Sequence, residues 1–198
     1  AYEADMRFLI DNYIKAEESK IVSDFGNQTL LDIIVSSGIA EAINELPDGI
    51  KSNQEAVAET IENNVRQKII REFLIDPAYF DKMSKVLDQI IRERKFNAIN
   101  YAEYLKRIAE LAKKVNNMET AGFPKKLKTK AQMALYNNLG KDLDLALEVD
   151  AAIRNTKNAD FRGNKPRENV IKQALYKILK DEDEVERIFR IAEKQIEY

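Results

Sequence analysis

Acidic side chains at short spacings are the first residues in this sequence whose types suggest chemistry. Glu18-Ser19-Lys20 matches the Glu-x-Lys triplet of metal-dependent nucleases, with Asp5 or Asp11 upstream as a further carboxylate. That chemistry needs a β-strand platform, whereas the surrounding apolar residues recur at helical spacing. An autonomous nuclease or hydrolase that uses a carboxylate-bound metal is therefore kept as the alternative hypothesis.

Two further patterns come close to known sites without completing them. Gly163-Asn164-Lys165 resembles the end of a phosphate-binding P-loop, but Asn158 stands where the first glycine belongs and Pro166 replaces the magnesium-binding hydroxyl. Glu148 and Asp150 lie two residues apart, so on a helix they project from different sides. Neither pattern predicts a nucleotide or metal site.

The composition excludes several classes of enzyme. The chain has 198 residues, no histidine and no cysteine. Serine–histidine triads, thiolate nucleophiles, disulfides and Cys- or His-ligated metals are therefore absent. We expect no metal or cofactor in this chain itself. The lack of cysteine fits a cytoplasmic protein, and no apolar run approaches the roughly 18 residues of a membrane span.

Positive charge gathers in the second half of the chain. Residues 1–100 hold 12 basic and 18 acidic side chains, whereas residues 101–198 hold 20 and 16. Two groups stand out, a basic run and a second basic cluster in a polar loop. Two basic loops on one domain can contact nucleic-acid phosphates, although each can also be a solvated loop. The basic run is Lys125, Lys126, Lys128 and Lys130, and the second basic cluster is Arg154, Lys157, Arg162, Lys165 and Arg167.

The elements that position these residues read as helices. Six glycines and four prolines fall where the helical pattern stops, and no segment shows the period-2 alternation of a strand. We predict an all-α, irregular multi-helix bundle of about eight to ten helices, with possible sub-lobes at 1–117 and 125–198. The first helix is predicted over 2–18. The chain opens inside that helix without an initiator Met, so we expect it to be part of a longer protein.

Caps and apolar stripes give the positions of the other helices. Ser52-x-x-Glu55 reads as a capping box that opens a long helix, and Asp76-Pro77 reads as the junction between that helix and the next. Thr29, Asn100, Thr129, Asp142 and Asp181 are predicted to begin further helices. Aromatic residues on apolar stripes are expected in the core, namely Phe73, Phe80, Tyr104 and Phe189. Aromatic residues near the basic stretches are candidates for contact with a partner, namely Tyr136, Phe161 and Tyr176.

Several stretches together resemble the C-terminal helical region of type I restriction enzyme R subunits. The resemblance extends over nearly the whole chain, and its most specific part is Phe161-Arg162-Gly163-Asn164-Lys165-Pro166-Arg167-Glu168-Asn169-Val170-Ile171. The other stretches are 46–50, 61–69, 108–112, 134–139, 172–175 and 184–189.

The resemblance implies a role in assembly. Such R subunits are ATP-dependent DNA translocases and nucleases that join a methyltransferase and specificity core. ATP and Mg²⁺ would then belong to domains outside this sequence, and no catalytic residue is implied here. The expected partners are the methyltransferase and specificity subunits, the motor domains of the same chain and, through the basic residues, double-stranded DNA.

Overall fold

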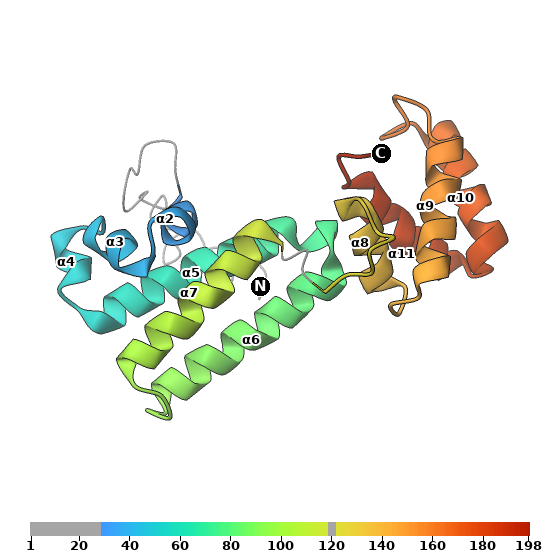
Figure 1. The fold of residues 1–198 in the computed structure, drawn as a ribbon. Coiled ribbons are helices and arrows are strands. Elements are labelled where there is room, and N and C mark those ends of the chain that lie inside the picture. Colours follow the sequence, from blue (N-terminus) through green and yellow to red (C-terminus); the bar gives the residue numbers. More distant parts are fainter. Residues whose placement is uncertain (1–28, 119–121) are drawn as a thin grey trace, which may run out of the picture.

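A computed structural model describes residues 29–118 and 122–198, and every regular element within these ranges is a helix (Figure 1). The predicted all-α multi-helix bundle is therefore confirmed. Two predictions lie outside the described residues: the helix over 2–18, and the carboxylate–lysine pattern of Asp5, Asp11, Glu18 and Lys20. No helix in the described part combines the length and apolarity that crossing a bilayer demands.

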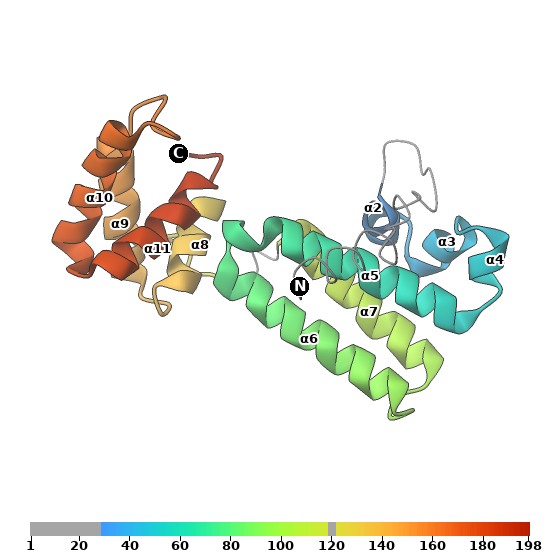
Figure 2. The same cartoon turned by 180° about the vertical axis from the view of Figure 1, so that it is seen from behind.

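Three long helices run side by side and form the body of the first half (Figures 1 and 2). The first helix of the described part packs on two of them, and two short helices follow it at one end of the body. The long helices are α5 (Gln54–Glu72), α6 (Pro77–Lys95) and α7 (Tyr101–Asn117), and the short ones are α2 (Leu30–Ser36), α3 (Ile39–Asn44) and α4 (Asp48–Lys51).

Most of the predicted caps are confirmed, with one shift by a single residue. The Thr29 side chain accepts from the Asp32 backbone N–H and completes a capping box, and Asn100 caps α7. The box predicted at Ser52 and Glu55 is wrong, because Ser52 ends α4 instead. Asn53 caps α5, and its Oδ1 accepts from the backbone N–H groups of Glu55, at 2.9 Å, and Ala56. An Asx side chain directly before the helix satisfies the same donors.

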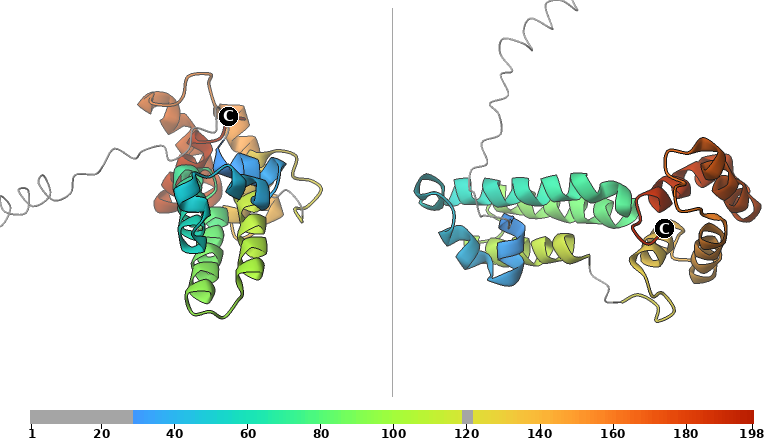
Figure 3. Two further views of the ribbon diagram at one scale, coloured as in Figure 1. Left: turned by 90° about the vertical axis from the view of Figure 1, so that its left-hand side faces the viewer. Right: turned by 90° about the horizontal axis from the view of Figure 1, so that it is seen from above.

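The helices of the second half pack together as a closed set (Figure 3). Each of them contacts its neighbours along the chain, and the last returns to pack on the first. Thr129, Asp142 and Asp181 cap three of these helices as predicted, and Asn164 caps the fourth. The four are α8 (Lys130–Asn138), α9 (Leu143–Thr156), α10 (Lys165–Leu179) and α11 (Glu182–Glu193).

Buried apolar residues form two clusters, one in each half. The first extends from Leu30 to Val115 and the second from Ala131 to Tyr198. Whether the sub-lobes 1–117 and 125–198 are separate domains stays a prediction. Two aromatic assignments are wrong: Phe73 is 38% exposed because a 3₁₀ turn, Phe73–Ile75, ends the helical stripe, and Phe161 is completely buried against Phe189.

The two halves meet at the carboxylate of Asp76, which has no exposure to solvent. Asn137 Nδ2 and Asn138 Nδ2 of α8 each donate to this carboxylate at 2.7 Å, and the backbone N–H of Tyr79 donates to it at 3.1 Å. A second contact lies beside the first: Gln195 Nε2 donates to the Ile75 carbonyl at 2.7 Å. Asp76, predicted to stand between two consecutive helices, therefore also joins the two halves.

Burying the Asp76 carboxylate at this junction has an electrostatic cost, and that cost changes the pKa of the group. Burial raises the pKa of Asp76, and the hydrogen bonds from Asn137, Tyr79 and Asn138 offset only part of that rise. No cation pairs with Asp76 among its partners. Three neutral donors therefore hold a buried anion, and the contribution of Asp76 to the stability of the folded protein depends on pH.

We expect Asp76→Ala to lower the free energy of unfolding by about 2–4 kcal/mol, because α6 loses its cap and the partly buried side-chain amides of Asn137 and Asn138 lose their acceptor. Since the pKa of Asp76 is raised in the folded state, the native protein binds more protons than the unfolded chain above the unfolded pKa. The stabilisation by Asp76 therefore grows as the pH falls, and the gap between wild type and variant should widen between pH 7 and pH 4. Urea denaturation of both proteins between pH 7 and pH 4 measures the difference in their free energies of unfolding. A difference that becomes smaller as the pH falls would contradict the raised pKa of Asp76.

Candidate interaction surfaces

The basic run lies on a short segment that leads into α8 and is held at one point. Lys125, Lys126, Lys128 and Lys130 are all exposed, whereas Leu127 between them is buried. The backbone N–H of Leu127 also donates to the Pro124 carbonyl at 3.0 Å. The lysines therefore project into solvent from an anchored backbone, and none of their side chains forms an ion pair with another described residue.

The N-terminus of α8 beside this run is already occupied by an anion. Glu197 Oε1 accepts from the backbone N–H groups of Lys130, at 3.0 Å, and Ala131, at 3.4 Å. A helix N-terminus favours negative charge, and Glu197 supplies it from the same chain. The lysine side chains, rather than the helix end, are therefore the groups left for an external partner.

The second basic cluster mostly holds the C-terminal segment in place, by which we mean residues 193–198. Arg162 donates to the carbonyls of Glu193 and Gln195, at 2.7 and 2.6 Å. Lys157 Nζ donates to the backbone oxygen of Tyr198 at 3.1 Å. Backbone oxygens of the last residues thus take the hydrogen bonds that a phosphate would otherwise receive.

The other members of the second basic cluster differ in whether they form ion pairs within the chain. Arg154 Nε lies 3.0 Å from both oxygens of Asp150, and Arg167 pairs with the exposed Asp160 at 3.7 Å. Lys165 is exposed and has no ion pair within the described part of the chain. Four of the five cations therefore already have partners, so an external phosphate would compete with them.

Asp150, which the sequence analysis considered only in a pair with Glu148, is a buried anchor. Its carboxylate accepts from Tyr198 Oη at 2.6 Å and from Gln132 Nε2 at 2.8 Å, in addition to Arg154. Burial, followed by the hydrogen bond to Asp150, raises the pKa of Tyr198. The i,i+4 spacing of Asp150 and Arg154 was the available signal, since such pairs share a helix face. The anchor joins α8, α9 and the C-terminal segment.

An apolar patch marks the end of the α5 body. Ile70, Phe73 and Leu74 are 69%, 38% and 51% exposed, and they lie within five residues, in the last turn of α5 and the 3₁₀ turn that follows it. Leu74 also lines a groove of about 390 Å³ along α11, together with Ile191 and charged residues that include Arg187 and Arg190. We refer to Ile70, Phe73 and Leu74 as the apolar patch.

The aromatic residues proposed as partner contacts fall into three different environments. Tyr176 is 48% exposed on α10, whereas Phe161 is fully buried and unavailable. Tyr136 is half-buried, and its ring packs edge to face against Phe123 at 6.0 Å. Within residues 29–118 and 122–198, no group of three or more acidic side chains lies close enough together to hold a metal ion.

Comparison with known proteins found no match among family models, curated proteins or solved structures. The surfaces described above and the sequence resemblance are therefore the grounds on which a function can be proposed.

We expect Arg162→Ala to lower the free energy of unfolding by about 1–3 kcal/mol, because two backbone carbonyls lose a charged donor. Lys165→Ala, which removes a cation of the same cluster that has no such partner, should change it by less than about 0.5 kcal/mol. Thermal or urea denaturation of both variants measures the difference. Equal effects would show that the cluster does not hold the C-terminal segment.

Proposed function

We propose that this chain is the helical C-terminal domain of a type I restriction enzyme R subunit, and that it docks the motor onto the methyltransferase and specificity subunits in the cytoplasm. The family assignment is supported by the sequence resemblance, and the docking role by the apolar patch. Catalysis, ATP and Mg²⁺ belong in this proposal to other domains of the parent subunit.

The exposure of the apolar patch is the observation that carries the docking role. Fully burying an exposed Ile, Phe or Leu side chain is worth about 1.5–3 kcal/mol, and these three neighbouring side chains are between 38% and 69% exposed, so covering them would add a part of that stabilisation for each. Exposed apolar groups beside polar residues are typical of protein–protein interfaces. Arg187 and Arg190 supply such a polar rim along α11.

The Asp76 junction makes this surface continuous across the two halves. The 3₁₀ turn that carries Phe73 and Leu74 contacts α11 directly, and Gln195 bonds to Ile75 within the same turn. A partner that binds the patch therefore contacts both halves, as a docking module that transmits force from a motor would require.

We expect the double substitution Phe73→Asp and Leu74→Asp to weaken binding to the purified methyltransferase–specificity complex by about 30-fold or more, since central apolar residues of an interface contribute about 2 kcal/mol or more. Phe96→Asp is the matched control, because Phe96 is 78% exposed in the turn between α6 and α7. Calorimetry measures both affinities. Absence of wild-type binding, or an equal loss in the control, would contradict the proposed docking surface.

We further propose that the basic run contacts the DNA backbone. Its four lysines are exposed and project from an anchored segment, which supports electrostatic contact without base recognition. Four phosphate contacts would make the affinity fall by about 10²-fold between 50 and 200 mM salt.

Substituting Lys125, Lys126, Lys128 and Lys130 with Glu should abolish most of this salt-dependent binding to duplex DNA without changing the melting temperature by more than a few degrees. The control reverses four exposed lysines elsewhere, namely Lys106, Lys113, Lys177 and Lys180. Fluorescence anisotropy across salt concentrations compares them. An unchanged affinity in the first variant, or an equal loss in the control, would exclude the basic run as the contact.

A further inference from the structure

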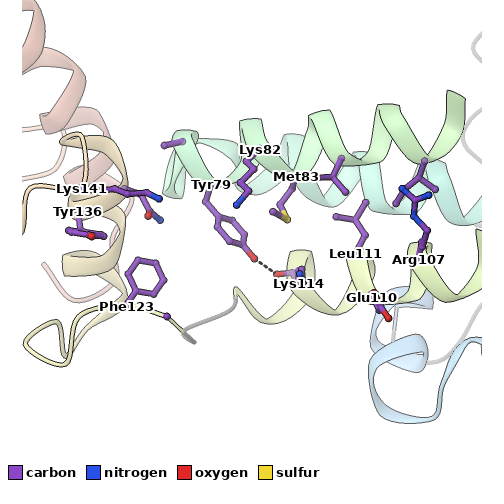
Figure 4. Close-up of a pocket in the computed structure, with 15 residues that line it drawn as sticks. Tyr79, Lys82, Met83, Arg107, Glu110, Leu111, Lys114, Phe123, Tyr136 and Lys141 are labelled. Atoms are coloured by element: carbon purple, nitrogen blue, oxygen red, sulfur yellow. Dashed lines mark hydrogen bonds between the residues drawn. The ribbon is translucent and has the colours of Figure 1, made fainter. Parts of the chain in front are cut away.

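A cleft of about 440 Å³ opens between the two halves of the molecule (Figure 4). Side chains of α6 and α7 form one side, and Tyr136, Asn137 and Lys141 from α8 and the turn after it form the other. Gly122 and Phe123 close one end. The volume lies within the range of small-molecule sites, about 300–1,000 Å³.

The walls of the cleft are strongly cationic. Lys82, Arg107, Lys114 and Lys141 line it, and Glu110 is the single acid among the described lining residues. Arg107 is already paired with Glu93. Lys82 and Lys141 are exposed and have no ion pair or hydrogen bond to another described side chain. Figure 4 shows them reaching from opposite sides toward the space beside Tyr79.

The backbone of the turn after α8 directs Lys141 to this place. Gly140 and Lys141 both adopt the left-handed conformation, with φ of 67° and 62°. For a residue with a Cβ this conformation costs about 1–2 kcal/mol. The backbone N–H of Lys141 donates to the Tyr136 carbonyl at 2.9 Å, which folds the lysine back beside α8.

Flat apolar surfaces lie next to these cations. Phe123 and Tyr136 pack edge to face, so the ring faces are not stacked on each other. The Tyr79 hydroxyl donates to the Lys114 carbonyl at 2.8 Å, which fixes the orientation of that ring. Met83 and Leu111 complete an apolar wall. A ligand that suits both features has an anionic group and a planar ring.

We propose that this cleft binds a nucleoside phosphate, with the phosphate between Lys82 and Lys141 and the base against the rings of Phe123 and Tyr136. Ammonium groups bind phosphate through charge-assisted hydrogen bonds, and bases stack on aromatic side chains whatever their sequence. In a duplex the bases are stacked inside, so the ligand is a free nucleotide or an unpaired strand. The inference does not depend on the docking role.

Calorimetric titration of the 198-residue chain with AMP tests the proposal, and we expect a dissociation constant below about 1 mM. Adenosine and inorganic phosphate should each bind at least about tenfold more weakly, because each lacks one half of the recognised chemistry. No saturable AMP binding, or inorganic phosphate that binds as tightly as AMP, would overturn the proposal.

Substitutions then locate the ligand. Lys82→Glu with Lys141→Glu should weaken AMP binding at least tenfold, whereas the matched pair Lys106→Glu with Lys113→Glu, on the exposed part of α7, should not change it. Phe123→Leu should weaken AMP binding and leave inorganic phosphate unaffected. All these side chains are at least partly exposed, and circular dichroism confirms that each variant is folded. An equal loss in the matched pair would overturn the proposal.

Competition identifies the source of the nucleotide. A single-stranded oligothymidylate that displaces AMP indicates an unpaired strand as the ligand, and one that does not indicates a free nucleotide; either result supports the cleft. Charge reversal of the basic run should leave AMP binding unchanged. A loss of AMP binding in that variant would overturn the location proposed here, and duplex binding is measured separately, so the two proposals can fail independently.

Discussion

A carboxylate that water does not reach, that of Asp76, stands where the two halves of the molecule meet. It caps α6 in one half and receives two side-chain amides from α8 in the other, so a local helix signal also fixes long-range geometry. Burying an anion without a cation is costly, and the pKa of Asp76 is raised by that burial. The position of α8 relative to α6 follows from satisfying this group. The inter-half cleft lies beside this contact, and the adjoining hydrogen bond from Gln195 to the Ile75 carbonyl joins the 3₁₀ turn of the apolar patch to the segment after α11.

The basic side chains of the second half fall into two groups: some bind other groups of the same chain, and others remain exposed. Lys157 and Arg162 donate to backbone oxygens of the chain's own C-terminal segment, Arg154 pairs with Asp150 of α9, and Glu197 occupies the N-terminus of α8. The lysines of the basic run, by contrast, remain exposed. Net charge along a sequence therefore overstates the surface that an external polyanion can reach, because each intramolecular partner removes a cation from it.

Local signals predicted the helices well. Caps such as Thr29, Asn100 and Asp181 act within one turn, and their effect can be read from neighbouring residues alone. The Ser52 assignment failed within this same range, since Asn53 is the better placed acceptor for the first N–H groups of α5.

Long-range features were not predictable in the same way. Phe73 continues an apolar stripe in sequence but lies where the helix tightens into a 3₁₀ turn, and Phe161 lies in a polar loop but packs into the second core. The cleft around Lys82 and Lys141 combines residues about 60 positions apart that no motif connects. Of the candidate surfaces, the basic run was predictable, whereas the apolar patch required knowledge of where α5 ends.

In the proposed docking role, the apolar patch and the adjoining face of α11 form one surface for the partner. Hydrogen-exchange mass spectrometry of the chain, free and bound to the methyltransferase–specificity complex, tests it directly. Peptides that cover 70–75 and 183–191 should become protected together on binding, while those that cover 96–100 stay unchanged. Protection confined to other segments, or none at saturating partner, would contradict the account.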